Sequence, residues 1–223
     1  MNEIAYKIHV DKVIETIERA RLTVSSHHIV KIVAVSKYSD TAAIEALYKI
    51  GQRAFGENRV QDLKAKSEAL EALPLEWHFI GNLQKNKINA LLEIDPTLFH
   101  ALDSIELAHA LQKRLQERHM QLDTLLQINS ANEASKHGVH CDEAVETYHQ
   151  IRETCPNINL RGVMSIGAHS EERKAVQHSF EATYRIFEQL DAEICSMGMS
   201  GDYELAIECG SNMVRLGSVL FPK

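Results

Sequence analysis

The chain has 223 residues, of which 44% are hydrophobic and 25% are charged, a composition typical of an ordinary globular protein. Its formal net charge of -7 argues against a surface that binds nucleic acid or an anionic membrane. We expect no secretory leader, because the first residues show no basic stretch followed by an apolar core. No apolar run approaches roughly 20 residues, and the cysteines form no CxxC pair. We therefore expect a soluble, cytoplasmic protein with one domain over residues 1–223.

Apolar runs and helical stripes alternate along the chain. Residues 3–22 carry a loose helical stripe, and the first buried strand, residues 32–35, stops just before Ser36 and Lys37. The other predicted strands are residues 53–57, 76–81, 97–102, 122–129, 159–167, 193–199 and 212–218. The stretches between them show helical spacing, at residues 41–50, 60–70, 84–92, 103–115, 141–154, 176–190 and 200–210.

This alternation predicts the fold class. Short apolar strands separated by helices indicate a parallel sheet whose outer face is covered by helices. Eight such units predict closure into a (β/α)8 barrel, a TIM-type α/β fold, in which helix 3–22 fills the place of a missing last helix. A doubly wound open sheet is the alternative, but it needs a glycine-rich turn after its first strand, and residues 36–40 contain no glycine.

The barrel prediction brings one lysine and two turns to the same end of the molecule. Functional side chains of such barrels lie at the carboxyl ends of the strands, and phosphate is often held by the loops after strands seven and eight. Lys37 follows the first strand. After the seventh, Gly198 and Gly201 allow close approach of backbone amides, and Ser200 adds a hydroxyl where we expect the next helix to start.

The turn after the seventh strand forms one half of a predicted binding site for an anion, here called the anion cradle. The eighth predicted strand supplies the other half. Gly217 and Ser218 offer a second amide and hydroxyl, and Arg215 offers a fixed positive charge. Each stretch alone can also be explained as loop residues and a helix cap. Their shared position in the barrel is what predicts a site for a phosphate-sized anion.

Lys37 has three possible roles at a strand end. It can snorkel to solvent, form a buried ion pair, or act as an amine nucleophile toward a carbonyl, and spacing alone ranks snorkelling first. The third role needs a neutral amine, which shielding from water at an apolar barrel mouth favours. An aldehyde that also carries a phosphate would satisfy both the lysine and the cradle.

Other candidate residues are weaker. His137, His140 and Cys141 could be metal ligands, but without a second matching cluster they are better explained as polar residues at a helix start. The chain has no HExxH, GxSxG or P-loop pattern. His78 lies inside an apolar strand, so it is either a core histidine with a hydrogen-bond partner or a residue near the ligand.

Six sequence blocks occur in a fixed order: AVSKYSD, GENRVQD, WHFIGNLQKNK, LLQINSANEASKHGV, GVMSIG and SMGMSGDYELAIECGSNMVRLGS. Together they resemble the pyridoxal 5′-phosphate homeostasis protein family, from about residue 30 to the end of the chain. The resemblance implies an alanine-racemase-like barrel without that enzyme's second, β domain. The segment GVMSIGAHS departs from the family in lacking the proline that commonly follows its sixth strand, and the LFPK ending also differs.

The resemblance also implies a cofactor and its ligands. Lys37 matches the lysine that forms an internal aldimine with pyridoxal 5′-phosphate. Ser200, Arg215, Gly217 and Ser218 match the region that holds the phosphate, as the barrel argument also predicts. Three further residues are expected around the cofactor ring: Asn58, His78 and Met199.

Two functions of different classes remain open. The first is a non-catalytic protein of vitamin B6 homeostasis that holds pyridoxal 5′-phosphate and supplies it to apo-enzymes. The second is an amino-acid racemase or related enzyme, which needs acid/base groups on both faces of its substrate; with one lysine and no second domain, the carrier is favoured. A Schiff-base aldolase would instead bind a sugar phosphate. We expect a monomer or weak dimer with no nucleic-acid or membrane partner.

Overall fold

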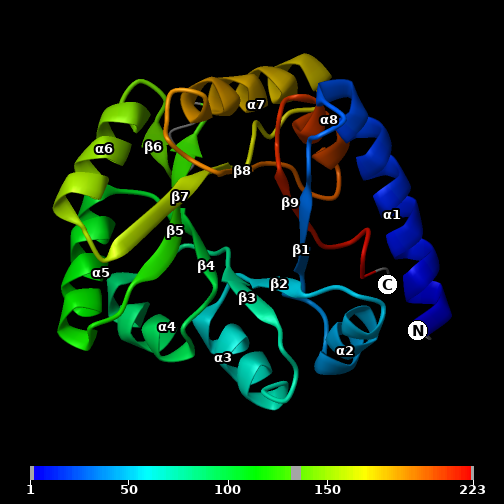
Figure 1. Cartoon of the computed structure of the whole chain (residues 1–223), viewed down its shortest axis with the longest axis horizontal. Coiled ribbons are helices and arrows are strands. Elements are labelled where there is room, and N and C mark those ends of the chain that lie inside the picture. The colour runs from blue at the N-terminus through cyan, green and yellow to red at the C-terminus, as the bar shows by residue number, and fades with distance from the viewer. Residues whose placement is uncertain (1–2, 132–136, 222–223) are drawn as a thin grey trace.

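A computed structural model describes residues 3–131 and 137–221, and eight of its strands close into a parallel ring (Figure 1). These strands are β1 (Lys31–Val35), β2 (Ala54–Glu57), β3 (Glu76–Phe79), β4 (Leu98–Leu102), β5 (Leu122–Asn129), β7 (Ile158–Ser165), β8 (Ile194–Ser196) and β9 (Met213–Leu216). The ring runs in this order, and β9 pairs with β1 to close it. The predicted eight-stranded barrel is therefore confirmed.

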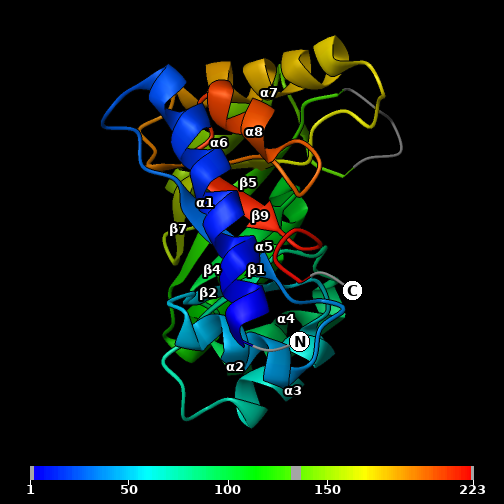
Figure 2. The ribbon, with the colours of Figure 1, turned by 90° about the vertical axis from the view of Figure 1, so that its right-hand side faces the viewer.

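Helices cover the outside of the ring. They are α1 (Glu3–Val24), α2 (Thr41–Lys49), α3 (Val60–Ala69), α4 (Ile88–Ile94), α5 (Ile105–Arg118), α6 (Ala144–Thr154), α7 (Arg173–Phe187) and α8 (Tyr203–Glu208), with a short 3-10 turn η1 (Lys85–Lys87) before α4. The leading helix α1 contacts both α8 and α2, so it completes the outer layer between the last and first units, as expected (Figure 1, Figure 2). In the described part of the chain, no helix is long and apolar enough to cross a membrane.

One small strand differs from the prediction. Val139 and His140 form β6, which pairs with the end of β5 outside the closed ring. Helix α6 consequently begins at Ala144, three residues after the predicted start at residue 141. His140 and Cys141 therefore belong to a strand and turn rather than to a helix start, because Val139 and His140 pair with β5.

Alternate residues of each strand point into the barrel. Two cavities lie at opposite ends of the strands. On β1, Lys31 lines a cavity of about 300 Å³ at the amino end of the strands. Val35, four residues later on the same face, lines a cavity of about 460 Å³ at the carboxyl end. The carboxyl-end cavity is where the barrel rule places function.

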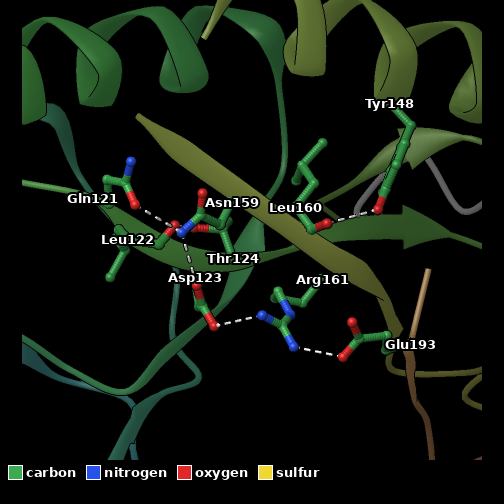
Figure 3. A network of polar contacts seen from close by, with 9 residues as sticks. All are labelled: Gln121, Leu122, Asp123, Thr124, Tyr148, Asn159, Leu160, Arg161 and Glu193. Atoms are coloured by element: carbon green, nitrogen blue, oxygen red, sulfur yellow. Dashed lines mark hydrogen bonds and ion pairs between the residues drawn. The ribbon is translucent and has the colours of Figure 1, made fainter. Parts of the chain in front are cut away.

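The amino end is held by polar contacts between neighbouring strands (Figure 3). Arg161 lies between two carboxylates, 3.5 Å from Asp123 and 2.5 Å from Glu193, and so links β5, β7 and the start of β8. The hydroxyl of Tyr148 donates to the carbonyl of Leu160 at 2.9 Å and attaches α6 to β7. Such partly exposed ion pairs each contribute at most about 1 kcal/mol, so they mainly fix register and leave stability to the core.

Candidate functional site

The loops after β1, β8 and β9 enclose the carboxyl-end cavity. Its volume of about 460 Å³ lies in the range that small-molecule sites occupy. Six of the eight predicted site residues line this cavity: Lys37, Met199, Ser200, Arg215, Gly217 and Ser218. The barrel fold therefore brings together residues that are up to 181 positions apart in the chain, 37 to 218.

Lys37 lies at the rim of this cavity. It follows the end of β1 by two residues, in the turn that leads to α2, where the Asp40 carboxylate caps the helix by accepting from the Ala43 amide at 2.9 Å. The Lys37 amine lies 5.1 Å from the ring centroid of Tyr38, and both side chains are exposed. The shielding from water that would favour a neutral amine is therefore not seen at Lys37, because the turn carries it beyond the end of the closed ring.

The turns after β8 and β9 contact each other directly. The backbone amide of Gly217 donates a 3.1 Å hydrogen bond to the hydroxyl of Ser200. The prediction that the helix starts at Ser200 is wrong, because α8 begins at Tyr203, with Asp202 in the N-cap position. The Asp202 carboxylate instead accepts from the Met199 amide at 2.6 Å, and this bond shapes the turn that presents Ser200.

The two glycines of the first turn have different structural roles. Gly198 has a φ of +92°, and a Cβ there would lie 2.7 Å from the Ala206 Cβ and 2.8 Å from the Tyr203 Cα. Only glycine fits this position without strain. A Cβ on Gly201 would meet nothing within 4 Å, so Gly201 leaves the turn open without being required by its backbone.

Arg215 lines the cavity but is bound to the barrel wall. Its guanidinium donates to the carbonyl and hydroxyl of Ser196 at 2.9 and 2.7 Å, and to the carbonyl of Ser165 at 2.9 Å. Burial lowers the pKa of Arg215 to about 10, so the group stays charged at neutral pH. Its charge therefore acts from beneath the cavity, from a position fixed by β7 and β8.

Asn58 and His78 are not among the residues that line this cavity. Asn58 is exposed at the carboxyl end of β2, with its backbone against Gly81, which follows β3. His78 is buried inside the barrel, lines the amino-end cavity, and shares a 2.8 Å hydrogen bond between its Nδ1 and the Nε2 of His100. The interpretation of His78 as a core histidine with a partner thus fits its surroundings, and the assignment of both residues to the cofactor ring stays a prediction.

The weaker metal-site candidates do not come together. His137 lies 3.3 Å from the Asp103 carboxylate, whereas Cys141 donates from its thiol to the carbonyl of Asn129 at 3.8 Å. In residues 3–131 and 137–221, no three His, Cys, Asp or Glu side chains gather in a group that could hold a metal ion. Residues 132–136, part of the fourth quoted block, lie outside the described residues.

Several residues of the site escaped the sequence reasoning. Ser196 and Ser165 hold the Arg215 guanidinium, and a polar residue at an inward position of an apolar strand is the signal that could have found them. Ile80 and Phe221 line the cavity from the loop after β3 and from the C-terminal segment. Nothing in the local pattern of either residue distinguishes it from ordinary core or terminal residues.

Comparison with known proteins identifies the family of this chain. Residues 8–222 match the family model described as alanine racemase, N-terminal domain. A pyridoxal phosphate homeostasis protein of Helicobacter pylori (strain J99) is 54% identical over 217 residues, which are 97% of this chain and 98% of that protein.

Two solved structures resemble the barrel over nearly its whole length. An unknown protein from Bifidobacterium adolescentis has a TM-score of 0.92 at 30% identity, covering 98% of this chain and 95% of that one. PipY of Synechococcus elongatus, solved with PLP bound, has a TM-score of 0.78 at 32% identity, covering 92% of this chain and 99% of that one. The chain therefore belongs to the pyridoxal phosphate homeostasis protein family, within the larger family defined by the alanine racemase N-terminal domain.

Proposed function

We propose that this protein binds pyridoxal 5′-phosphate in the carboxyl-end cavity, holds it as an aldimine on Lys37, and supplies it to other proteins in vitamin B6 homeostasis. One observation carries the proposal: Lys37 and the joined turn of Ser200 and Gly217 line the same cavity. The names of the H. pylori relative and the PLP-bound PipY structure support the same ligand.

The side chains of the cavity suit both ends of this cofactor. The amine nitrogen of Lys37 would add to the aldehyde carbon, and the aldehyde oxygen would leave as water. The hydroxyls of Ser200 and Ser218, with the backbone amides of their turns, are hydrogen-bond donors for a phosphate group. Arg215 adds positive charge beneath the cavity. An exposed Lys37 side chain is free to reach an incoming aldehyde and later to release it.

We propose that the protein is not an enzyme. Racemisation needs a second acid/base group that faces the first across the substrate. Tyr38 is an ionisable residue of the cavity lining, but its ring centroid lies 5.1 Å from the Lys37 amine and its side chain arises from the same turn. A pyridoxal-phosphate-dependent racemase or related enzyme is the alternative function.

The cellular setting completes the proposal. We propose a single functional domain over residues 1–223, working in the cytoplasm as a monomer or weak dimer. The four cysteines, all in the described part of the chain, form no disulfides there, as is usual for cytoplasmic proteins. Sedimentation at several protein concentrations measures the oligomeric state.

A trapping experiment tests the binding mode. The purified protein is incubated with pyridoxal 5′-phosphate, reduced with borohydride, digested and mapped by mass spectrometry. We expect a reduced pyridoxyl adduct on Lys37 and none in Lys37→Ala. An adduct spread over several exposed lysines, or equal trapping in Lys37→Ala, would exclude Lys37 as the binding residue.

A transfer assay separates the carrier from the enzyme. The loaded protein is mixed with an apo-enzyme that requires pyridoxal 5′-phosphate, and recovery of that enzyme's activity is followed against free cofactor. We expect transfer, together with no turnover of free amino acids. Racemisation at a typical enzyme rate of ~10 per second would replace the carrier with the enzyme.

A further inference from the structure

The residue that precedes Lys37 is held on every side. Ser36 is fully buried, and its amide donates to the carbonyl of Gly56 on β2 at 3.0 Å. Its hydroxyl donates to a carboxylate oxygen of Glu57 at 2.6 Å, and its carbonyl accepts from the Lys66 amine at 2.8 Å. All of its hydrogen-bonding groups are thus occupied by β2 and α3.

Two of these partners form an ion pair beneath the helical layer. The Lys66 amine lies 2.7 Å from the same Glu57 oxygen that accepts from Ser36. Glu57 has no exposed side-chain surface, and the side chain of Lys66 is 15% exposed. Removing two charges from water is costly, and an apolar pair of similar volume often stabilises a fold equally well. Fold stability alone therefore does not account for this pair.

The other carboxylate oxygen of Glu57 strengthens this point. Glu57 Oε2 is buried and has no hydrogen-bond partner within residues 3–131 and 137–221. A side chain selected only for stability would not leave such an oxygen unpaired. By contrast, Lys64 on the same helix is an exposed lysine with a solvent-facing ion pair to Glu93. The two lysines of α3 therefore serve different purposes.

The Ser39 amide donates to the Ser36 carbonyl at 2.8 Å and closes the turn around Lys37, while the buried side-chain contacts stop at Ser36. Lys37 and Tyr38 beyond it are exposed, so the backbone before the lysine is fixed while its side chain remains free. An amine that must meet an aldehyde whose phosphate is anchored in another turn benefits from such a fixed origin, because a small misplacement lowers the rate and the affinity strongly.

We propose that Ser36, Glu57 and Lys66 form a positioning clamp that fixes the backbone origin of Lys37, so that its amine reaches the aldehyde of pyridoxal 5′-phosphate while the phosphate is held at Ser200 and Gly217. Lys66 and Glu57 are positioning residues, acting through Ser36. The clamp rests on the proposed function and assigns it three residues that lie outside the cavity lining.

A pair of ligands isolates the effect of the clamp. Pyridoxine 5′-phosphate keeps the ring and phosphate but has an alcohol in place of the aldehyde, so it cannot bond covalently to Lys37. For Lys66→Met and for the double variant Glu57→Gln with Lys66→Met, we expect the dissociation constant for pyridoxal 5′-phosphate to rise roughly tenfold to a hundredfold. That for pyridoxine 5′-phosphate should stay within about threefold, since the phosphate turns are untouched.

Controls separate positioning from folding. Lys66→Met leaves a buried carboxylate unpaired, whereas the double variant removes both charges and keeps the interior neutral. Thermal unfolding followed by circular dichroism identifies folded variants. Lys64→Met, on the same helix but solvent-facing, should bind both ligands as the parent chain does, and Lys66→Arg should recover part of the lost aldehyde binding.

The outcomes distinguish the clamp from the proposed function. A folded double variant that binds both ligands and is trapped by borohydride like the parent chain would overturn the clamp. Equal weakening of both ligands would also overturn it, because the pair would then support the whole cavity. Absence of a Lys37 adduct in the parent chain itself would refute the proposed function, and the clamp with it.

Discussion

The backbone amide of Gly217 donates a 3.1 Å hydrogen bond to the hydroxyl of Ser200, which lies 17 positions earlier in the chain. This contact joins the turns after β8 and β9 into one wall of the carboxyl-end cavity. Lys37 approaches the same cavity from the turn after β1. Because β9 pairs with both β8 and β1, the closure of the barrel is what places the wall and the lysine together.

Replacing Ser200 by alanine should weaken binding at the phosphate end. The change removes a hydroxyl from the cavity and leaves the Gly217 amide without its acceptor. We expect the dissociation constant for pyridoxal 5′-phosphate to rise roughly fivefold to tenfold, the value of one neutral hydrogen bond. An absorbance or fluorescence titration measures this. Ser67→Ala, at a partly exposed serine of α3, is the matched control, and an unchanged affinity in Ser200→Ala would place the phosphate elsewhere.

The two glycines of the β8 turn should respond differently to alanine. At Gly198, a φ of +92° and a Cβ approach of 2.7 Å to Ala206 predict a stability loss of at least about 2 kcal/mol. Gly201→Ala adds its methyl group to open space, and we expect a change within about 0.5 kcal/mol. Urea unfolding of both variants provides the comparison. Equal losses would mean that the backbone of this turn differs from the one described.

Removing the Arg215 side chain should cost stability as well as ligand affinity. Arg215→Met removes the buried guanidinium donors of the Ser196 and Ser165 carbonyls, which predicts a loss of roughly 2–4 kcal/mol in the free energy of unfolding. Arg173→Met, in which an exposed arginine loses its ion pair with Glu208, should cost about 0.5 kcal/mol or less. If the two variants unfold at the same urea concentration, the buried guanidinium of Arg215 contributes no more to stability than the exposed ion pair of Arg173 does.

The stability of the barrel should decrease below neutral pH. Burial lowers the pKa of His78, although the nearby Glu76 carboxylate partly opposes this, and burial together with nearby positive charge lowers the pKa of His100. The folded chain therefore binds these protons less readily than the unfolded chain does. A group whose pKa is lower in the fold opposes folding once the pH falls below its unfolded value of about 6.5. Stability from these residues is therefore complete above that pH and is lost as the pH falls below it.

Melting temperatures between pH 7.5 and pH 5 check this expectation. The double variant His78→Gln with His100→Gln should show a shallower decline with falling pH than the parent chain, since its interior amides do not titrate. His27→Gln, an exposed histidine outside the barrel interior, serves as the control. A parent chain and double variant with parallel pH profiles would show that other groups determine the acid sensitivity.

Much of the architecture could be predicted from local sequence. Each strand and helix carries its own hydrophobic period, and these periods are set by backbone geometry that neighbouring residues share. Eight such strands imply a closed barrel, and the barrel rule then places Lys37 and the glycine-serine turns at one end. The same periodicity could not detect the two-residue strand β6, because its pairing with β5 is a tertiary contact.

The chain by itself therefore determined the barrel, the position of Lys37 at a strand end, and the two turns opposite it, because short-range periodicity and turn chemistry encode them. Only the tertiary structure decided that Arg215 binds Ser196 and Ser165, and that His78 pairs with His100. It also decided that Lys66 reaches Ser36. These contacts depend on strand register and on the inward or outward direction of each side chain, which follow from the closure of the whole ring.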